Sequence, residues 1–214
     1  MDSDEEQALL EELIEDVKPP TGAPAGLHYL LFTPFRYPPL GHGSRFGTRA
    51  EHGIWYGSRT RATAFAEKAY YLLLFLEGTT AELTPLETDV SIFQAACDTR
   101  KGVDLTRGAF ARYAELISSP SDYVASQMLG REMRADGVEA FVYASARDPE
   151  HGANVGLFVR EAIASRKPSV PESWRCVVTR DGVEVTKEDV FRSASFAFKR
   201  RVFEVDGRLP APAF

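Results

Sequence analysis

A single carboxylate on an apolar helix is the most distinctive candidate for chemistry in this sequence. Residues 60–76 are predicted to be helical, and the apolar face of this helix carries Phe65, Ala69, Leu72, Leu73 and Leu76. Glu67 lies within its first turns, where burial of a carboxylate is costly unless the group is paired or functional. Glu67 is therefore a candidate for stabilising positive charge, and a structural ion pair with a neighbouring arginine is the alternative.

Three other segments carry side chains suited to binding a ligand. The turn GSRFG, residues 43–47, presents the planar donor fork of Arg45 between glycines that let the backbone approach an anion. Tyr56 ends a predicted strand and could stack on an aromatic ring. Ser145 follows another predicted strand without an adjacent base, so we expect its hydroxyl to bind rather than to attack. A surface arginine in a turn and a core tyrosine are the alternative interpretations.

Several common signatures are missing from the sequence. It contains no GxxxxGK[ST], HExxH or GxSxG motif, and GHGSRFG does not sit between a predicted strand and helix as a Rossmann turn must. Cys97 and Cys176 lie far apart without CxxC spacing. No metal-ligand spacing relates the four histidines, which are His28, His42, His52 and His151. We therefore expect no metal site and no catalytic histidine.

The four segments resemble the RES domain family. Its pattern is an Arg in a Gly-Arg-aromatic turn, a Tyr that ends a strand, a Glu on the next helix and a Ser in a Tyr-Pro-Ser-Ala-Arg-like segment. Eleven positions separate Arg45 from Tyr56, and eleven separate Tyr56 from Glu67. The matching residues are Arg45, Tyr56, Glu67 and Ser145, and the resemblance covers residues 27–160, with Ala144 where the family often has proline.

This resemblance implies a toxin of a bacterial toxin–antitoxin pair that cleaves the nicotinamide–ribose bond of NAD⁺ by phosphorolysis or hydrolysis. It also implies a fold related to the ADP-ribosyltransferases, NAD⁺ as a substrate, inorganic phosphate as a possible co-substrate, no bound cofactor and a cognate antitoxin as partner. The four matching residues are the expected catalytic set. Further contacts to the ligand are expected from Arg36, Ser44, Phe46 and Asn154.

Each of the four side chains suits one part of this substrate. Arg45 could hold the pyrophosphate or an incoming phosphate, and Tyr56 could stack on the nicotinamide. Glu67 could stabilise an oxocarbenium-like ribose or bond to its hydroxyls. Ser145 could bond to a phosphate or to the nicotinamide amide. Two alternatives stay open: transfer of ADP-ribose to a protein on the same fold, and a binding or regulatory module without catalysis.

The elements expected around these residues favour an α+β fold, a mixed β-sheet core with flanking helices. Strands are predicted at 27–32, 54–56, 140–143, 155–158, 175–179, 183–185 and 195–205, with a long loop over 34–53. A second helix is predicted from an N-cap at Ser121 to Ala135, ending before Gly137. Trp55 should point away from Tyr56, since neighbouring residues of a strand face opposite sides.

The chain divides into three predicted parts. Residues 1–18 read as an acidic amphipathic helix, residues 19–26 as a Pro/Gly linker, and residues 27–214 as the RES-like catalytic domain with a C-terminal β extension at 165–214. Residues 1–18 hold eight of the 31 acids and one of the 25 Lys and Arg, so the remainder is almost neutral. This balance argues against direct binding of nucleic acid.

The expected location is the cytoplasm. The N-terminus is acidic rather than basic, and the longest apolar run, residues 69–76, is too short to span a membrane. The stripe of Leu9, Leu10, Leu13, Ile14 and Val17 could pack on a partner, on a second copy in a homo-oligomer or on the chain's own core.

Overall fold

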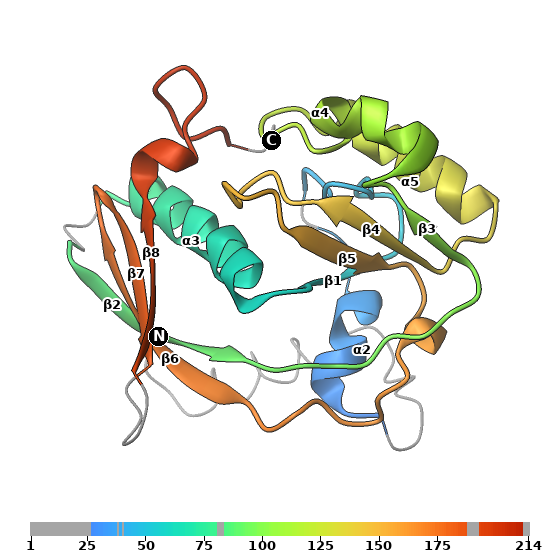
Figure 1. Ribbon diagram of the computed structural model, residues 1–214, viewed down its shortest axis with the longest axis horizontal. Helices are drawn as coiled ribbons and strands as arrows, with labels where there is room; N and C mark the ends of the chain where they lie inside the picture. Colours follow the sequence, from blue (N-terminus) through green and yellow to red (C-terminus); the bar gives the residue numbers. More distant parts are fainter. Residues whose placement is uncertain (1–26, 38, 40, 81–83, 188–192, 212–214) are drawn as a thin grey trace, which may run out of the picture.

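Two four-stranded sheets frame the protein, and a long helix lies between them (Figure 1). The computed structural model describes residues 27–37, 39, 41–80, 84–187 and 193–211. The first sheet has the order β1-β5-β4-β3, with β1 (Trp55–Ser58), β5 (Ala153–Leu157) and β4 (Ala140–Ala144) antiparallel and β3 (Gly102–Asp104) parallel to β4. The second is antiparallel, in the order β2 (Leu86–Ile92), β6 (Glu172–Thr179), β7 (Gly182–Lys187) and β8 (Ala194–Lys199).

The central helix α3 (Arg61–Gly78) begins where the side chain of Thr60 caps it, because Thr60 Oγ1 accepts the N–H of Thr63 at 3.1 Å. Its apolar face packs on the inner face of the second sheet, where Phe65 contacts Trp174 with ring centroids 4.9 Å apart. The rest of this core consists of Ala69, Tyr70, Leu72, Leu73, Cys176, Val178, Val183, Val185, Phe203 and Leu209. The second sheet is therefore the platform that holds α3.

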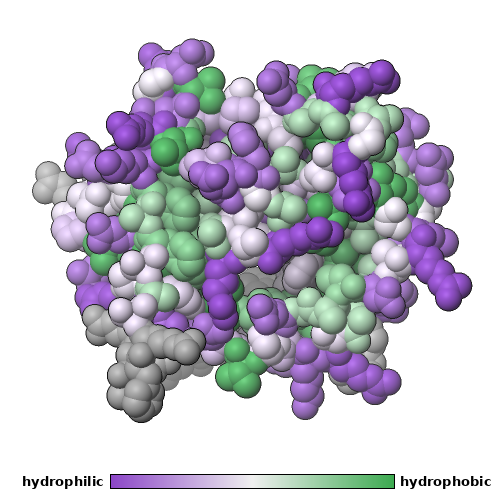
Figure 2. All heavy atoms as spheres, viewed as in Figure 1, coloured by the Kyte–Doolittle hydropathy of each residue, from purple (hydrophilic) through white to green (hydrophobic). Residues whose placement is uncertain are grey.

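The core of the second sheet reaches the molecular surface at its margins. Hydrophobic side chains there are only partly buried, and they include Leu74, Leu76, Leu86, Val90, Phe196 and Phe198. In Figure 2 apolar side chains gather over the region of α3 and the second sheet and also over parts of the region of the first sheet, with hydrophilic side chains between and around them. The face in view thus mixes polar and apolar areas.

The first sheet is covered on both faces. On one face, α5 (Val124–Ala135) and the short α4 (Ala114–Ile117), which follows the 3-10 helix η1 (Gly108–Tyr113), enclose a core that includes Phe46 and Phe141. On the other face, α2 (Tyr29–Arg36) packs Leu31 against Leu157, close to the 3-10 helix η2 (Arg160–Ala162). A last 3-10 helix, η3 (Arg200–Val202), follows β8.

The prediction of an α+β fold with a mixed sheet is confirmed, and the relationship to the ADP-ribosyltransferases stays a prediction. The helix predicted at 60–76 is α3, and the strands predicted at 54–56, 140–143 and 155–158 are β1, β4 and β5. Gly137 has φ +71°, as expected for a residue that ends a helix. The helix and linker predicted within residues 1–26 lie outside the described residues.

The prediction of a strand at residues 27–32 is wrong, because residues 29–36 form the helix α2. The core around Leu157 is contacted by Leu27, Leu31 and Phe35. These residues recur every four positions, and this spacing is helical. His28 starts the helix, since its Nδ1 accepts the N–H of Leu30 at 3.3 Å. The predicted loop at 34–53 accordingly begins only at Tyr37.

The N-cap predicted at Ser121 is also wrong. Helix α5 begins at Val124 with Tyr123 in the cap position, and the side chain of Asp122 accepts the N–H of Val124 at 2.8 Å. The strand predicted at 195–205 is shorter, because β8 ends at Lys199 and η3 follows. Strands β2 and β3 were not predicted: Leu86–Ile92 does alternate apolar or β-branched residues with polar ones, a strand signal that was missed, whereas β3 has only three residues.

A glycine on α5 lets this helix approach the turn that carries Arg45. A Cβ atom on Gly130 would overlap the carbonyl oxygen of Phe46. Phe46 has no exposed surface and packs against the rings of Phe141 and Tyr143, so its backbone cannot easily move away. The close contact of α5 with residues 44–47 therefore requires glycine at position 130.

We expect Gly130→Ala to lower the free energy of unfolding by about 1–3 kcal/mol, because overpacking outweighs the gain of about 1 kcal/mol in helix propensity. Gly78→Ala is the matched control, since nothing lies within 4 Å of a Cβ at the exposed end of α3. Urea denaturation of both variants is the measurement. Equal stability of the two variants would contradict the close contact.

Candidate active site

Three of the four predicted catalytic side chains line one cavity, of about 630 Å³, between the first sheet and α3. This volume lies within the range of about 300–1,000 Å³ that is common for small-molecule sites. The predicted residues along its wall are Arg45, Tyr56, Glu67, Ser44 and Asn154. The fourth, Ser145, lies directly behind Glu67.

Glu67 is held by two side-chain hydrogen bonds that end on the same oxygen. The hydroxyl of Ser145 donates to Oε1 at 2.7 Å, and Nδ2 of Asn154 donates to Oε1 at 2.6 Å. Among the described residues, Oε2 accepts no hydrogen bond. The carboxylate is thus anchored through one oxygen, and the other is available in a side chain that lines the cavity.

Ser145 is fully buried and its hydroxyl is in use. Its Oγ accepts the N–H groups of Arg147 and Asp148, at 3.1 Å and 2.9 Å, while it donates to Glu67. The hydroxyl that we expected to bind a ligand donates to the carboxylate of Glu67, and its contact with a ligand stays a prediction. Asn154 is similarly buried, and its Oδ1 accepts the hydroxyl of Ser58 at 2.6 Å. Both residues therefore position Glu67.

Tyr56 connects the strand β1 to the turn of Arg45. Its hydroxyl shares a hydrogen bond with Ser44 Oγ at 3.0 Å and accepts the N–H of Phe46 at 3.2 Å. Burial raises the pKa of Tyr56 to about 12, so the phenol is neutral at physiological pH. The hydroxyl is engaged within the protein, and only the ring is available to the cavity.

Arg45 crosses from its turn to the segment that connects α4 to α5. Its Nη1 donates to the carbonyl oxygen of Ser119 at 2.6 Å, and its guanidinium carbon lies 4.5 Å from the ring centroid of Tyr123. The backbone of Ser44 and Gly47 closes the turn, where Gly43 adopts φ +76°. A cation is therefore fixed at the cavity wall by a carbonyl group and a ring face.

Two of the expected ligand contacts lie away from the cavity wall. Phe46 is a core residue without exposed surface, so its side chain cannot touch a ligand. Arg36, in the last turn of α2, lies over the ring of its neighbour Tyr37 at 5.5 Å and is not part of the lining. The cavity is lined instead by their sequence neighbours Tyr37 and Arg45.

Sequence reasoning missed a set of tyrosines in the cavity wall, Tyr37, Tyr71, Tyr123 and Tyr143. Burial raises the pKa values of Tyr71 and Tyr143, and the charge of Glu67 acts in the same direction. Their rings are therefore neutral and electron-rich faces around a carboxylate. One signal was in the sequence: Tyr71 lies four residues after Glu67, on the same face of a helix.

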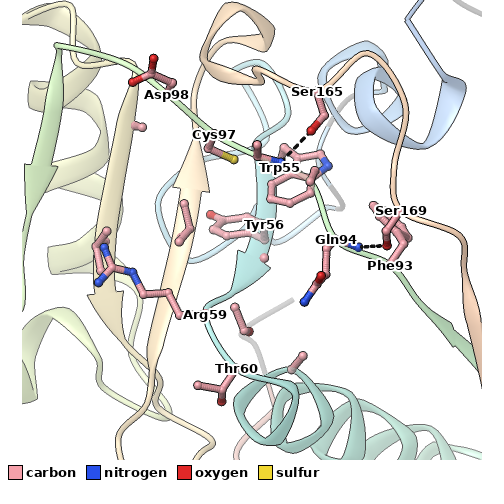
Figure 3. A pocket seen from close by; sticks show the side chains of 18 of the residues that line it. Trp55, Tyr56, Arg59, Thr60, Phe93, Gln94, Cys97, Asp98, Ser165 and Ser169 are labelled. Carbon is pink, nitrogen blue, oxygen red and sulfur yellow. Dashed lines mark hydrogen bonds between the residues drawn. The ribbon is translucent and has the colours of Figure 1, made fainter.

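A second, larger groove of about 1,080 Å³ is lined by Trp55 on the other face of β1, and Tyr56 borders this groove as well as the smaller cavity (Figure 3). The prediction that Trp55 faces away from Tyr56 is confirmed, since Trp55 packs with the core around Leu157. The hydroxyls of Ser165 and Ser169 accept the N–H groups of Ala96 and Gln94, both at 2.8 Å, and so hold residues 94–96. This groove lacks Arg45 and Glu67, so the smaller cavity is the candidate active site.

No group of three or more His, Cys, Asp or Glu in the described part of the chain could hold a metal ion. In the same residues, no helix has the length and apolar character needed to cross a membrane.

The candidate site thus sets a carboxylate among tyrosines and beside an arginine, on an α+β fold. A comparison with protein families matches residues 19–179 to the RES domain. The chain therefore belongs to the RES domain family, which is associated with toxin–antitoxin systems and with NAD-related enzymatic activity. No curated protein matches the chain. The matched residues include the whole cavity wall and end at β6.

The role of the Tyr56 hydroxyl can be tested by Tyr56→Phe. At pH 7 we expect a loss of about 1–3 kcal/mol in the free energy of unfolding, since the buried N–H of Phe46 loses its acceptor. The raised pKa means that the folded state holds the phenol proton more tightly than the unfolded chain. This contribution is fully present below pH 10 and is lost as the pH rises through 12.

The difference in stability between the wild type and Tyr56→Phe should therefore shrink between pH 10 and pH 12, measured by urea denaturation across that range. Tyr113→Phe, at an exposed position on η1, controls for the loss of a hydroxyl and should match the wild type at pH 7. A difference that stays constant with pH would be inconsistent with a buried Tyr56 phenol.

Proposed function

We propose that this protein cleaves the N-glycosidic bond between nicotinamide and ribose in NAD⁺. The observation that carries the proposal is the anchoring of Glu67, whose Oε1 accepts hydrogen bonds from Ser145 and Asn154 while Oε2 is unengaged among the described residues. A carboxylate held in this way, at the wall of a cavity, is preorganised to stabilise positive charge that develops on a substrate.

The reaction generates such a charge. When the bond between the anomeric carbon and the pyridinium nitrogen breaks, both electrons leave with nicotinamide, which becomes neutral, and the ribose carries an oxocarbenium-like charge. Glu67 stabilises this state through its negative charge or through a bond to the ribose hydroxyls. A nucleophile then forms the new bond to the anomeric carbon, and its proton is released.

The tyrosines of the wall suit the cationic end of the substrate. A pyridinium ring is attracted to neutral aromatic faces, and each such contact contributes about 0.5–2 kcal/mol depending on its exposure. Tyr56, Tyr71 and Tyr143 all line the cavity with Glu67. This environment favours the oxidised, cationic form of the dinucleotide over its neutral reduced form.

Arg45 suits the anionic part. One of its nitrogens bonds to Ser119, and the guanidinium keeps further N–H donors that can pair with phosphate oxygens. We infer that Arg45 binds the pyrophosphate. Contact with a charge that does not change during the reaction would mainly lower the KM for NAD⁺.

Family membership supports two further parts of the proposal. The association with toxin–antitoxin systems supports a cognate antitoxin as partner, encoded beside this gene. The acceptor of ADP-ribose is water, in a hydrolysis, or inorganic phosphate, in a phosphorolysis. Transfer to a protein side chain would need the same first step and is the alternative that product analysis separates.

We expect Glu67→Gln to lower NAD⁺ consumption by about 100-fold or more, because the neutral amide keeps the shape but loses the charge that stabilises the transition state. Glu184→Gln, an exposed position on β7, is the matched control and should retain wild-type turnover. Circular dichroism verifies the fold of both variants. Wild-type turnover in a folded Glu67→Gln protein would refute the assignment of Glu67.

Mass spectrometry of the products identifies the acceptor. Purified protein is incubated with NAD⁺ in the presence and absence of inorganic phosphate. ADP-ribose indicates hydrolysis, ADP-ribose 1″-phosphate indicates phosphorolysis, and a mass increase on protein without free ADP-ribose indicates protein modification. If NAD⁺ persists under every condition while the fold is intact, the proposed function is wrong.

A further inference from the structure

We infer that Arg147 is a positioning residue of this site, which fixes Arg45 through Tyr123; the part of this inference that concerns NAD⁺ rests on the proposed function. Arg147 is only 2% exposed and lies in the turn after β4. Its Nη2 donates to the carbonyl oxygen of Pro120 at 2.7 Å and lies 3.4 Å from the hydroxyl of Tyr123. Its side chain therefore reaches the segment between α4 and α5.

Tyr123 lies between two arginines. Its ring face carries the guanidinium of Arg45 at 4.5 Å, while its hydroxyl accepts from Arg147. Arg45 also bonds to Ser119 in the same segment. Residues 118–123 have no regular secondary structure, so these contacts from both sides define where Tyr123 and Arg45 sit.

The backbone of Arg147 connects this arrangement to Glu67. Its N–H donates to Ser145 Oγ, which in turn donates to the carboxylate of Glu67. One turn, residues 145–148, therefore holds both charged groups of the cavity: the carboxylate through the hydroxyl of Ser145, and the guanidinium of Arg45 through the side chain of Arg147. The distance between the two groups is thereby set from one place in the chain.

The environment of Arg147 is costly for a side chain that only fills space. Its guanidinium carbon lies 3.5 Å from the ring centroid of Tyr70, and Nη1 is buried without a hydrogen-bond partner among the described residues. A buried donor that is left unsatisfied is destabilising. A planar fork that can stack on one ring while it bonds to a carbonyl and a hydroxyl is specific to arginine.

The kinetic test uses Arg147→Lys, Arg147→Met and Tyr123→Phe in the full chain. In both Arg147 variants Arg45 loses its fixed position, so the KM for NAD⁺ should rise by about tenfold while kcat changes by less than about threefold. Tyr123→Phe keeps the ring under Arg45 and should change KM in the same direction by a smaller factor. Arg107→Met, an exposed arginine paired with Asp104, should match the wild type.

The double variant Arg147→Met/Tyr123→Phe tests whether Arg147 acts on Arg45 through Tyr123. If Arg147 acts through Tyr123, the double variant should raise KM no further than Arg147→Met alone, because residues of one contact network are not additive. Independent effects that multiply, or a fall in thermal stability with KM unchanged, would mean that Arg147 is merely structural and would overturn the inference.

A second readout does not depend on catalysis. The guanidinium of Arg45 lies over the face of Tyr123, so we expect the ring current to shift the Nε–H proton resonance of Arg45 in ¹H–¹⁵N spectra. Arg147→Lys should move this resonance, and Arg107→Met should leave it in place. If the wild type fails to consume NAD⁺, the proposed function fails while this measurement still decides the inference. An unchanged Arg45 resonance in folded Arg147→Lys and Arg147→Met proteins would overturn it.

Discussion

The hydroxyl of Ser145 is the contact on which the site depends. It accepts two backbone N–H groups of its own turn and donates a charge-assisted hydrogen bond to Glu67. This one hydroxyl therefore connects the turn after β4 to the helix α3. Without Ser145 and Asn154, the inner oxygen of Glu67 would be desolvated and unsatisfied, which is costly in a region of low dielectric. With them, the carboxylate has one position and one available oxygen.

This contact requires both sheets. Asn154 lies opposite Tyr143 in the β4–β5 pairing, and Ser145 follows β4, so the register of the first sheet brings the two donors together. A shift of one residue would turn Asn154 to the other face of the sheet. Glu67 meets them only because α3 is seated on the second sheet through Phe65, Leu73 and their neighbours. Strands β6 to β8, in the region predicted as a C-terminal extension, thus contribute to the position of the carboxylate.

The sequence allowed good prediction where the signal is local. The helix of Glu67 is long and continuously apolar from Ala69 to Leu76, and the strand of Tyr56 is a short apolar run between Gly53 and Gly57. Residues 27–32 misled because apolar residues in a short run fit either period, and only packing of Leu31 against the first sheet decides for a helix. The strand β2 was a local signal that was missed, since Leu86, Val90 and Ile92 pack on the core of the second sheet and alternate with the polar residues of this segment.

The site shows the same division. Glu67 could be singled out because a carboxylate on a buried apolar helix needs a reason, whereas the roles of Ser145 and Arg147 arise from contacts across 78 residues to Glu67 and 24 residues to Tyr123. Such contacts are set by the closure of the whole fold. The tyrosine wall was hidden for a related reason, since its members come from separate elements and share only the space they enclose.

The alternation along β1 has a practical consequence. Trp55 and Trp174 are the two tryptophans of the chain; the first lies on the strand of Tyr56 but faces the opposite groove, and the second lies in the core beneath α3. Each sheet thus has one intrinsic fluorophore outside the candidate cavity. Trp55 reports on β1, and Trp174 reports on the packing of α3 against the second sheet. The fluorescence of two single-tryptophan variants can therefore separate changes at the candidate cavity from changes in the core that holds α3.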